Sequence, residues 1–96
     1  MSGELKVTAG SGNVFRDLGF PEAEAQNLLL RADLMSKVRT AARGMTQEQA
    51  AKRFGVTQPR INDLLRGRID KFSLDALVNM LATAGLRVEV RVKKAA

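Results

Sequence analysis

The 96-residue chain contains no cysteine, histidine, tryptophan or tyrosine, and only two prolines. Without cysteine it has neither a disulfide framework nor a cysteine-ligated zinc site. Without histidine, imidazole acid–base catalysis, Ser-His-Asp triads and histidine-ligated metals are excluded. No apolar run approaches the ~18 residues of a membrane span, and no signal-peptide core is visible near the N-terminus. We therefore expect a cytoplasmic protein that is not an enzyme, needs no cofactor or metal, and has no membrane partner.

Positive charge is concentrated in the middle of the chain. Sixteen Lys and Arg face ten Asp and Glu, which gives a net charge of +6. Residues 31–71 hold ten of the basic residues and only four acidic ones, whereas residues 1–30 carry a net negative charge. A basic excess in one segment favours a nucleic-acid partner. The alternative is an ordinary solvated basic surface.

The first half of the sequence predicts a tail, a small cap and a helix. Residues 1–12 are polar and glycine-containing, so we expect a flexible tail followed by a single domain over residues 13–96. Within the tail, Leu5 and Val7 offer a short edge strand as the weaker alternative. The apolar cluster at residues 14–20 is interpreted as a cap packed on the domain. Residues 21–43 are rich in Ala and Leu and predict either one long helix or two helices with a bend.

The next segment predicts three short helices separated by glycines. Thr46 and Gln49 fit a capping box, Thr57 fits an N-cap, and Ser73 begins a further helix. A capped helix, a tight glycine turn and a second short helix form a helix-turn-helix. The residues that set its register are Thr46, Gln47, Ala51, Gly55, Thr57, Ile61, Leu64 and Gly67.

Residues 86–93 alternate apolar and charged side chains and predict a half-buried strand. We see no partner for it within the chain, so we expect a second copy to pair with it in an antiparallel C2 dimer. Centring the twofold axis on Val90 places Glu89 opposite Arg91 of the other copy, which is favourable. The predicted fold is mainly α, with four to five helices and one C-terminal strand that pairs across the dimer. The predicted dimerisation residues are Leu86, Val88, Glu89, Val90, Arg91 and Val92.

The run TQEQAAKRFGVTQPRINDLLRGRIDKFSLDAL resembles the Cro/cI-type, or xenobiotic-response-element, helix-turn-helix family. The upstream stretch GNVFRDLGFPEAEA narrows the resemblance to the subgroup that includes HigA-type antitoxins. The resemblance covers residues 12–93 and implies a lambda-repressor-like bundle. It also implies a repressor that binds an inverted-repeat operator in double-stranded DNA as a homodimer, and a cognate toxin as protein partner in a type II toxin–antitoxin pair. The alternatives are a stand-alone regulator, or a helical protein-interaction or RNA-binding module.

The helix that begins at Thr57 is the predicted recognition helix. By resemblance, Gln58 falls where this family places a base-reading glutamine, and Gln47 where it places a phosphate-contacting one. From the residue chemistry, Pro59 suits a thymine methyl and Asn62 suits adenine. Phosphate contacts are expected from Arg60, Arg66, Arg68 and Thr57. For Asp63, we favour an ion pair with Arg60 over a contact with cytosine.

Overall fold

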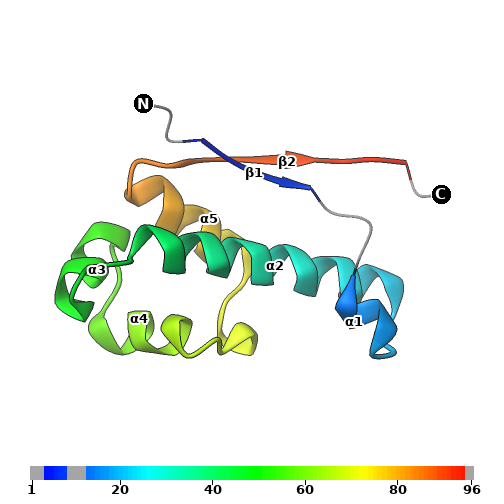
Figure 1. Ribbon diagram of the computed structural model, residues 1–96, viewed down its shortest axis with the longest axis horizontal. Helices are drawn as coiled ribbons and strands as arrows, with labels where there is room; N and C mark the ends of the chain where they lie inside the picture. The colour runs from blue at the N-terminus through cyan, green and yellow to red at the C-terminus, as the bar shows by residue number, and fades with distance from the viewer. Residues whose placement is uncertain (1–3, 9–12, 95–96) are drawn as a thin grey trace.

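The computed structural model describes residues 4–8 and 13–94 and confirms a mainly helical protein (Figure 1). Five α-helices and one short 3-10 helix are followed by a C-terminal strand, and a further strand precedes them. In chain order the elements are β1 (Glu4–Thr8), α1 (Val14–Asp17), α2 (Glu22–Ala41), α3 (Gln47–Phe54), α4 (Gln58–Leu65), η1 (Ile69–Lys71), α5 (Leu74–Thr83) and β2 (Arg87–Arg91).

The three predicted helix starts are confirmed by their capping hydrogen bonds. At the start of α3, the Gln49 amide donates to Thr46 Oγ1 at 3.1 Å and the Thr46 amide donates to Gln49 Oε1 at 3.0 Å. Thr57 Oγ1 accepts from the Arg60 amide at 3.3 Å, and Ser73 Oγ accepts from the Ala76 amide at 3.1 Å. Each cap satisfies a backbone donor that has no partner within its helix.

Helix α2 is one continuous helix of 20 residues, which resolves the alternative of two shorter ones. It runs along the long axis of the molecule and joins α1 at one end to α3 at the other (Figure 1). Its buried residues are Ala25, Leu28, Leu34, Met35 and Val38. Within the described part of the chain, no helix is both long enough and apolar enough to cross a membrane.

The core lies between α2, α5 and the α3–α4 pair. Its largest fully buried side chains are Phe54, Phe72, Leu34, Ile61, Leu64, Leu77, Leu81 and Val38. Burying a Leu or Phe side chain contributes roughly 1.5–3 kcal/mol. These residues therefore fix α3 and α4 on the rest of the domain.

The structure corrects the expectations for the N-terminal segment and for the partner of the C-terminal strand. Strand β1 pairs with β2 in parallel, with Glu4 beside Arg87 and Thr8 beside Arg91. The tail assignment is therefore wrong for residues 4–8, while residues 1–3 and 9–12 lie outside the described part. The prediction that β2 has no partner within the chain is also wrong. A parallel pair formed by the two ends of a sequence leaves no local turn signal, because its connection is the whole helical domain.

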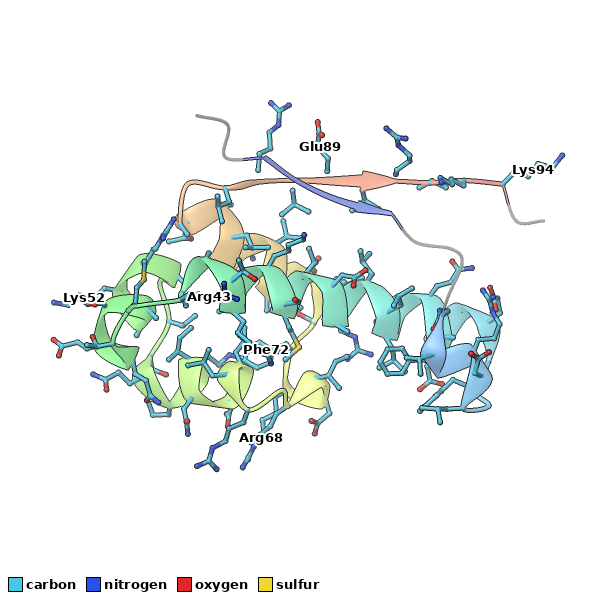
Figure 2. All side chains as sticks on the ribbon, viewed as in Figure 1. Arg43, Lys52, Arg68, Phe72, Glu89 and Lys94 are labelled. Atoms are coloured by element: carbon cyan, nitrogen blue, oxygen red, sulfur yellow. The ribbon has the colours of Figure 1, made fainter. Side chains whose placement is uncertain are left out.

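The two-stranded sheet covers the helices on the side opposite α4 (Figure 1). Strand β1 contacts α2, and β2 contacts α5. Leu86 and Val88 pack against the core, and Glu89 points away from the helices (Figure 2). The alternation predicted for the strand holds only in part, because Val88 and Glu89 are both half-buried and Val90 is 47% exposed. Strand β2 ends at Arg91, and the side chain of Val92 is 90% exposed.

Helix α1 is fixed to the start of α2 by polar and aromatic contacts. Asn13 is buried, and its Oδ1 accepts from the amides of Phe15 and Arg16. Arg16 Nε and Nη2 each donate to the Glu22 carboxylate at 2.6 Å, and these bonds lower the pKa of Glu22 and raise the pKa of Arg16. The Phe15 and Phe20 rings meet edge to face with centroids 6.1 Å apart. The predicted cap therefore packs on the domain only in part, since Leu18 is 70% exposed.

Candidate nucleic-acid interface

Helices α3 and α4 pack together as a helix-turn-helix, and the turn requires the glycine at its centre. Gly55 has φ +70°, a left-handed conformation that side chains rarely adopt. A Cβ atom at this position would also meet Thr83 Cγ2 at 3.0 Å. Ala51 in α3 is buried, and so are Ile61 and Leu64 in α4. The predicted register of the motif is therefore confirmed.

Most of the predicted DNA-binding residues lie on the exposed side of this motif. Gln58 and Pro59 form the exposed first turn of α4, and Thr57 is exposed at its N-cap. Gln47 is exposed at the first position of α3, and Asn62 is half-buried. The segment that follows α4 exposes Arg66, Arg68 and Lys71. Arg68 points away from the body of the protein on the side opposite the sheet (Figure 2).

The structure gives Arg60 contacts within the protein. Its guanidinium carbon lies 4.1 Å from the centroid of the Phe72 ring, and Nη1 donates to the Lys71 carbonyl oxygen at 2.6 Å. The residue is half-buried. A guanidinium that stacks on a ring and donates a hydrogen bond to a carbonyl is held in one direction. Arg60 thus joins α4 to the segment that follows η1, a contact that sequence spacing did not reveal.

A second arginine holds the same segment from the other side. Arg31, in the middle of α2, donates through Nη1 to the carbonyl oxygens of Ile69 at 3.2 Å and Phe72 at 3.4 Å. Its Nε donates to Asn27 Oδ1 at 2.6 Å, which orients the guanidinium. The backbone of residues 69–72 is therefore fixed by one arginine from α2 and one from α4. No local pattern predicts this contact, because Arg31 lies 38 residues before Ile69.

Asp63 does not form the ion pair that we expected. Instead of Arg60, its partners are Arg68, with Nη1 3.7 Å from Oδ1, and Lys71, with Nζ 3.8 Å from Oδ2. The expectation rested on spacing within α4. It fails because Phe72 and the Lys71 carbonyl take the Arg60 guanidinium, and because η1 brings Lys71 back beside α4.

Two further cations near the motif also have partners. Lys52 Nζ lies 3.8 Å from the Glu48 carboxylate one turn earlier in α3, and Lys52 projects at the far end of the molecule (Figure 2). Arg53 Nη1 donates to the Ala41 carbonyl at 3.2 Å, and its guanidinium lies 5.9 Å from the Phe54 ring centroid. Lys52 thus pairs within α3, and Arg53 joins α3 to the end of α2.

An open cleft of about 220 Å³ lies between the turn of the motif and α5. Its lining residues are Phe54, Gly55, Val56, Arg60, Ala76, Asn79, Met80 and Thr83. The lining has no carboxylate and a single cation, Arg60, which is already engaged. Among the described residues, no cluster of three or more acidic side chains is placed to hold a metal ion. The lining of the cleft is therefore neutral apart from Arg60.

A family model described as a helix-turn-helix domain matches residues 14–93, from α1 to just beyond β2. The chain therefore belongs to this helix-turn-helix domain family. No curated protein matches it significantly. A helix-turn-helix domain is a DNA-binding module, which assigns the chain to the class of DNA-binding regulators.

Proposed function

We propose that the protein is a sequence-specific transcriptional repressor that binds double-stranded DNA in the cytoplasm through α3 and α4. The observation that carries this proposal is the capped helix-turn-helix, whose second helix exposes a polar first turn beside a cluster of cations. Such a helix enters the major groove with its N-terminal residues toward the base edges. The net charge of +6 favours approach to a polyanion.

The proposed roles divide between base reading and phosphate binding. Gln58 and Asn62 pair with adenine, and Pro59 contacts a thymine methyl. Arg66, Arg68 and Thr57 bind phosphate oxygens, and the amides at the start of α3 beside Gln47 bind another. Arg60 was expected to bind phosphate as well. Its contacts with Phe72 and Lys71 favour an indirect role, in which it positions the segment that carries the other cations.

The test uses a duplex selected from a random library by the purified protein, and a scrambled duplex of the same composition. Gln58→Ala should weaken binding to the selected duplex by about 1–3 kcal/mol and leave the scrambled duplex unaffected. Arg66→Ala should weaken both duplexes alike. If Gln58→Ala does not change the ratio of the two affinities, Gln58 does not read a base.

The proposed binding unit is a homodimer formed through β2. Within the described residues, β2 is paired along one edge only, which leaves the other edge for a second copy. Two identical antiparallel neighbours in one sheet are related by a twofold axis perpendicular to the sheet. Because the sheet lies opposite α4, this axis keeps both recognition helices on one face (Figure 1). The operator would then be an inverted repeat with half-sites about one helical turn, ~34 Å, apart.

Charge exchange tests the register of this dimer. With the axis at Val90, Glu89 lies opposite Arg91 of the second copy. Glu89→Lys or Arg91→Glu alone should raise the dimer dissociation constant about tenfold, and the double exchange should restore it. Sedimentation equilibrium measures the constant, and Glu24→Lys on α2 serves as the control. If the double variant dimerises as weakly as the single variants, this register is excluded.

The resemblance to HigA-type antitoxins supports a second role, in which the repressor neutralises a toxin and autoregulates the shared operon. The surface that favours a protein partner is α1, where Val14 and Leu18 are 53% and 70% exposed and lie one helical turn apart. Co-expression with the product of the neighbouring reading frame tests this role. Relief of growth arrest and co-purification are the expected results. A neighbour that neither arrests growth nor binds would leave a stand-alone regulator.

A further inference from the structure

We propose that Asp63 limits the affinity of the protein for DNA of any sequence by acting as an internal counter-charge for Arg68 and Lys71. This inference rests on the proposed DNA-binding function. The Asp63 carboxylate stands where a DNA phosphate would otherwise take both cations. A phosphate that approaches the end of α4 must therefore displace the carboxylate from the two side chains.

The first support is that the backbone carrying the two cations is fixed. Arg31 bonds the carbonyls of Ile69 and Phe72, and Arg60 bonds the carbonyl of Lys71. These three hydrogen bonds join α2 and α4 to the segment that contains Lys71 and follows Arg68. The segment cannot move away from α4 without breaking hydrogen bonds to charged donors. Arg68 and Lys71 are thereby kept within reach of Asp63.

The second support is that both oxygens of the carboxylate are in use. Oδ1 faces Arg68 at 3.7 Å and Oδ2 faces Lys71 at 3.8 Å. Base reading by this carboxylate would require it to leave two cations and approach the phosphate backbone, which repels it. The geometry therefore favours a charge-balancing role over the pairing with cytosine that remained as an alternative.

The third support is the difference in exposure among the three side chains. Arg68 and Lys71 are 45% and 47% exposed, whereas Asp63 is 24% exposed. The cations can thus rotate toward solvent and a phosphate, while the carboxylate stays behind them. At separations near 4 Å such pairs are weak, so DNA can break them at a modest cost. Asp63 therefore lowers the affinity for DNA by a modest amount that is the same for every DNA sequence.

The experiment measures binding of the full chain to a fluorescent duplex of random sequence at several salt concentrations. Asp63→Asn keeps the shape of the side chain and removes its charge. We expect this variant to bind about threefold to tenfold more tightly than the wild type at ~0.1 M salt. We also expect the slope of log K against log salt to become more negative by about 1, because a released cation neutralises a further phosphate. The control is Asp17→Asn, which makes the same change of net charge on α1 at the other end of the molecule (Figure 1).

The same substitution in a protein that lacks the two cations tests whether Asp63 acts through them. In a protein that carries Arg68→Gln and Lys71→Gln, Asp63→Asn should give little or no gain, because the cations it balances are gone. The proposal is overturned if Asp63→Asn increases the affinity for DNA just as much in this background. It is also overturned if Asp17→Asn increases the affinity as much as Asp63→Asn does. Unchanged or weaker binding by a folded Asp63→Asn protein, with folding verified by circular dichroism, overturns it as well. If the wild type shows no salt-dependent binding to any duplex, the DNA-binding function itself fails, which is a distinct result.

Discussion

The Arg60 guanidinium lies over the ring of Phe72, 4.1 Å from its centroid, and donates to the neighbouring Lys71 carbonyl at 2.6 Å. A cation on α4 is thus used to join that helix to the segment after η1. Phe72 is fully buried, so the stack closes the edge of the hydrophobic core. The same contact holds the backbone from which Lys71 projects toward Asp63.

Replacing Arg60 should therefore reduce stability before it affects any phosphate contact. Arg60→Ala removes a stacked cation and a charged donor, and we expect the free energy of unfolding to fall by about 1–3 kcal/mol. Arg60→Lys should recover only part of this loss, because an ammonium cannot stack and donate in the same geometry. Urea unfolding followed by circular dichroism measures both. Arg66→Ala is the control, since Arg66 is exposed and should change stability by less than ~0.5 kcal/mol.

The close approach of Gly55 to Thr83 predicts that a side chain at position 55 lowers stability. Gly55→Ala introduces strain at φ +70° and places a methyl group 3.0 Å from Thr83 Cγ2, so we expect a loss of about 2 kcal/mol. Gly44→Ala is a matched control. Gly44 has φ +82°, but its added methyl group would meet no atom within 4 Å, so it should lose only the backbone part, about 1 kcal/mol.

Thr83→Ser removes Cγ2 and keeps the hydroxyl that donates to the Asn79 carbonyl. Combined with Gly55→Ala, it should restore part of the lost stability in thermal melting. Equal losses for Gly55→Ala and Gly44→Ala, with no rescue by Thr83→Ser, would show that backbone conformation alone accounts for the glycine.

Ala51 provides a test of packing within the helix-turn-helix. Its side chain is 5% exposed, and Ala51→Leu should lower the free energy of unfolding by roughly 1–3 kcal/mol through overpacking. Ala82→Leu makes the same substitution at an exposed position of α5 and should leave the melting temperature nearly unchanged. Similar melting curves for the two variants would contradict the packing described for α3.

Local signals in the sequence were sufficient for the starts of α3, α4 and α5 and for the exposed first turn of α4. Thr46, Thr57 and Ser73 each act on amides only a few residues away, so their caps are readable from spacing. The parallel pairing of β1 with β2 depends on residues from opposite ends of the chain. The partners of Arg31 and Arg60 depend on how η1 folds back beside α4. Contacts between distant segments cannot be predicted from the spacing of residues in the sequence. They determine the partners of Arg60 and Asp63.

The ion pair between Arg16 and Glu22 predicts how the attachment of α1 depends on pH. Hydrogen bonds from Arg16 lower the pKa of Glu22 below its ordinary value, so the ionised carboxylate is favoured in the folded state. A group with a lowered pKa adds stability above its unfolded value, and this stability is lost as the pH falls through the folded value. We therefore expect wild type to melt at a higher temperature than Glu22→Gln at pH ~7, and the difference to shrink as the pH falls below the ordinary range of a glutamate and through the lowered pKa of Glu22.

Glu24→Gln is the control for this experiment, because Glu22 and Glu24 both lie in the first turn of α2 and both interact with the helix dipole. Glu22 has the arginine partner and also accepts from Gln26 Nε2 at 3.0 Å, so a difference between the two variants reports these bonds rather than the helix dipole. Hydrogen exchange of the peptide that covers residues 13–20 gives a local readout, since the pair joins this segment to α2. Faster exchange in Glu22→Gln than in Glu24→Gln at pH ~7 is expected. Equal exchange in the two variants would mean that the edge-to-face contact of Phe15 with Phe20 holds α1 in place without the ion pair.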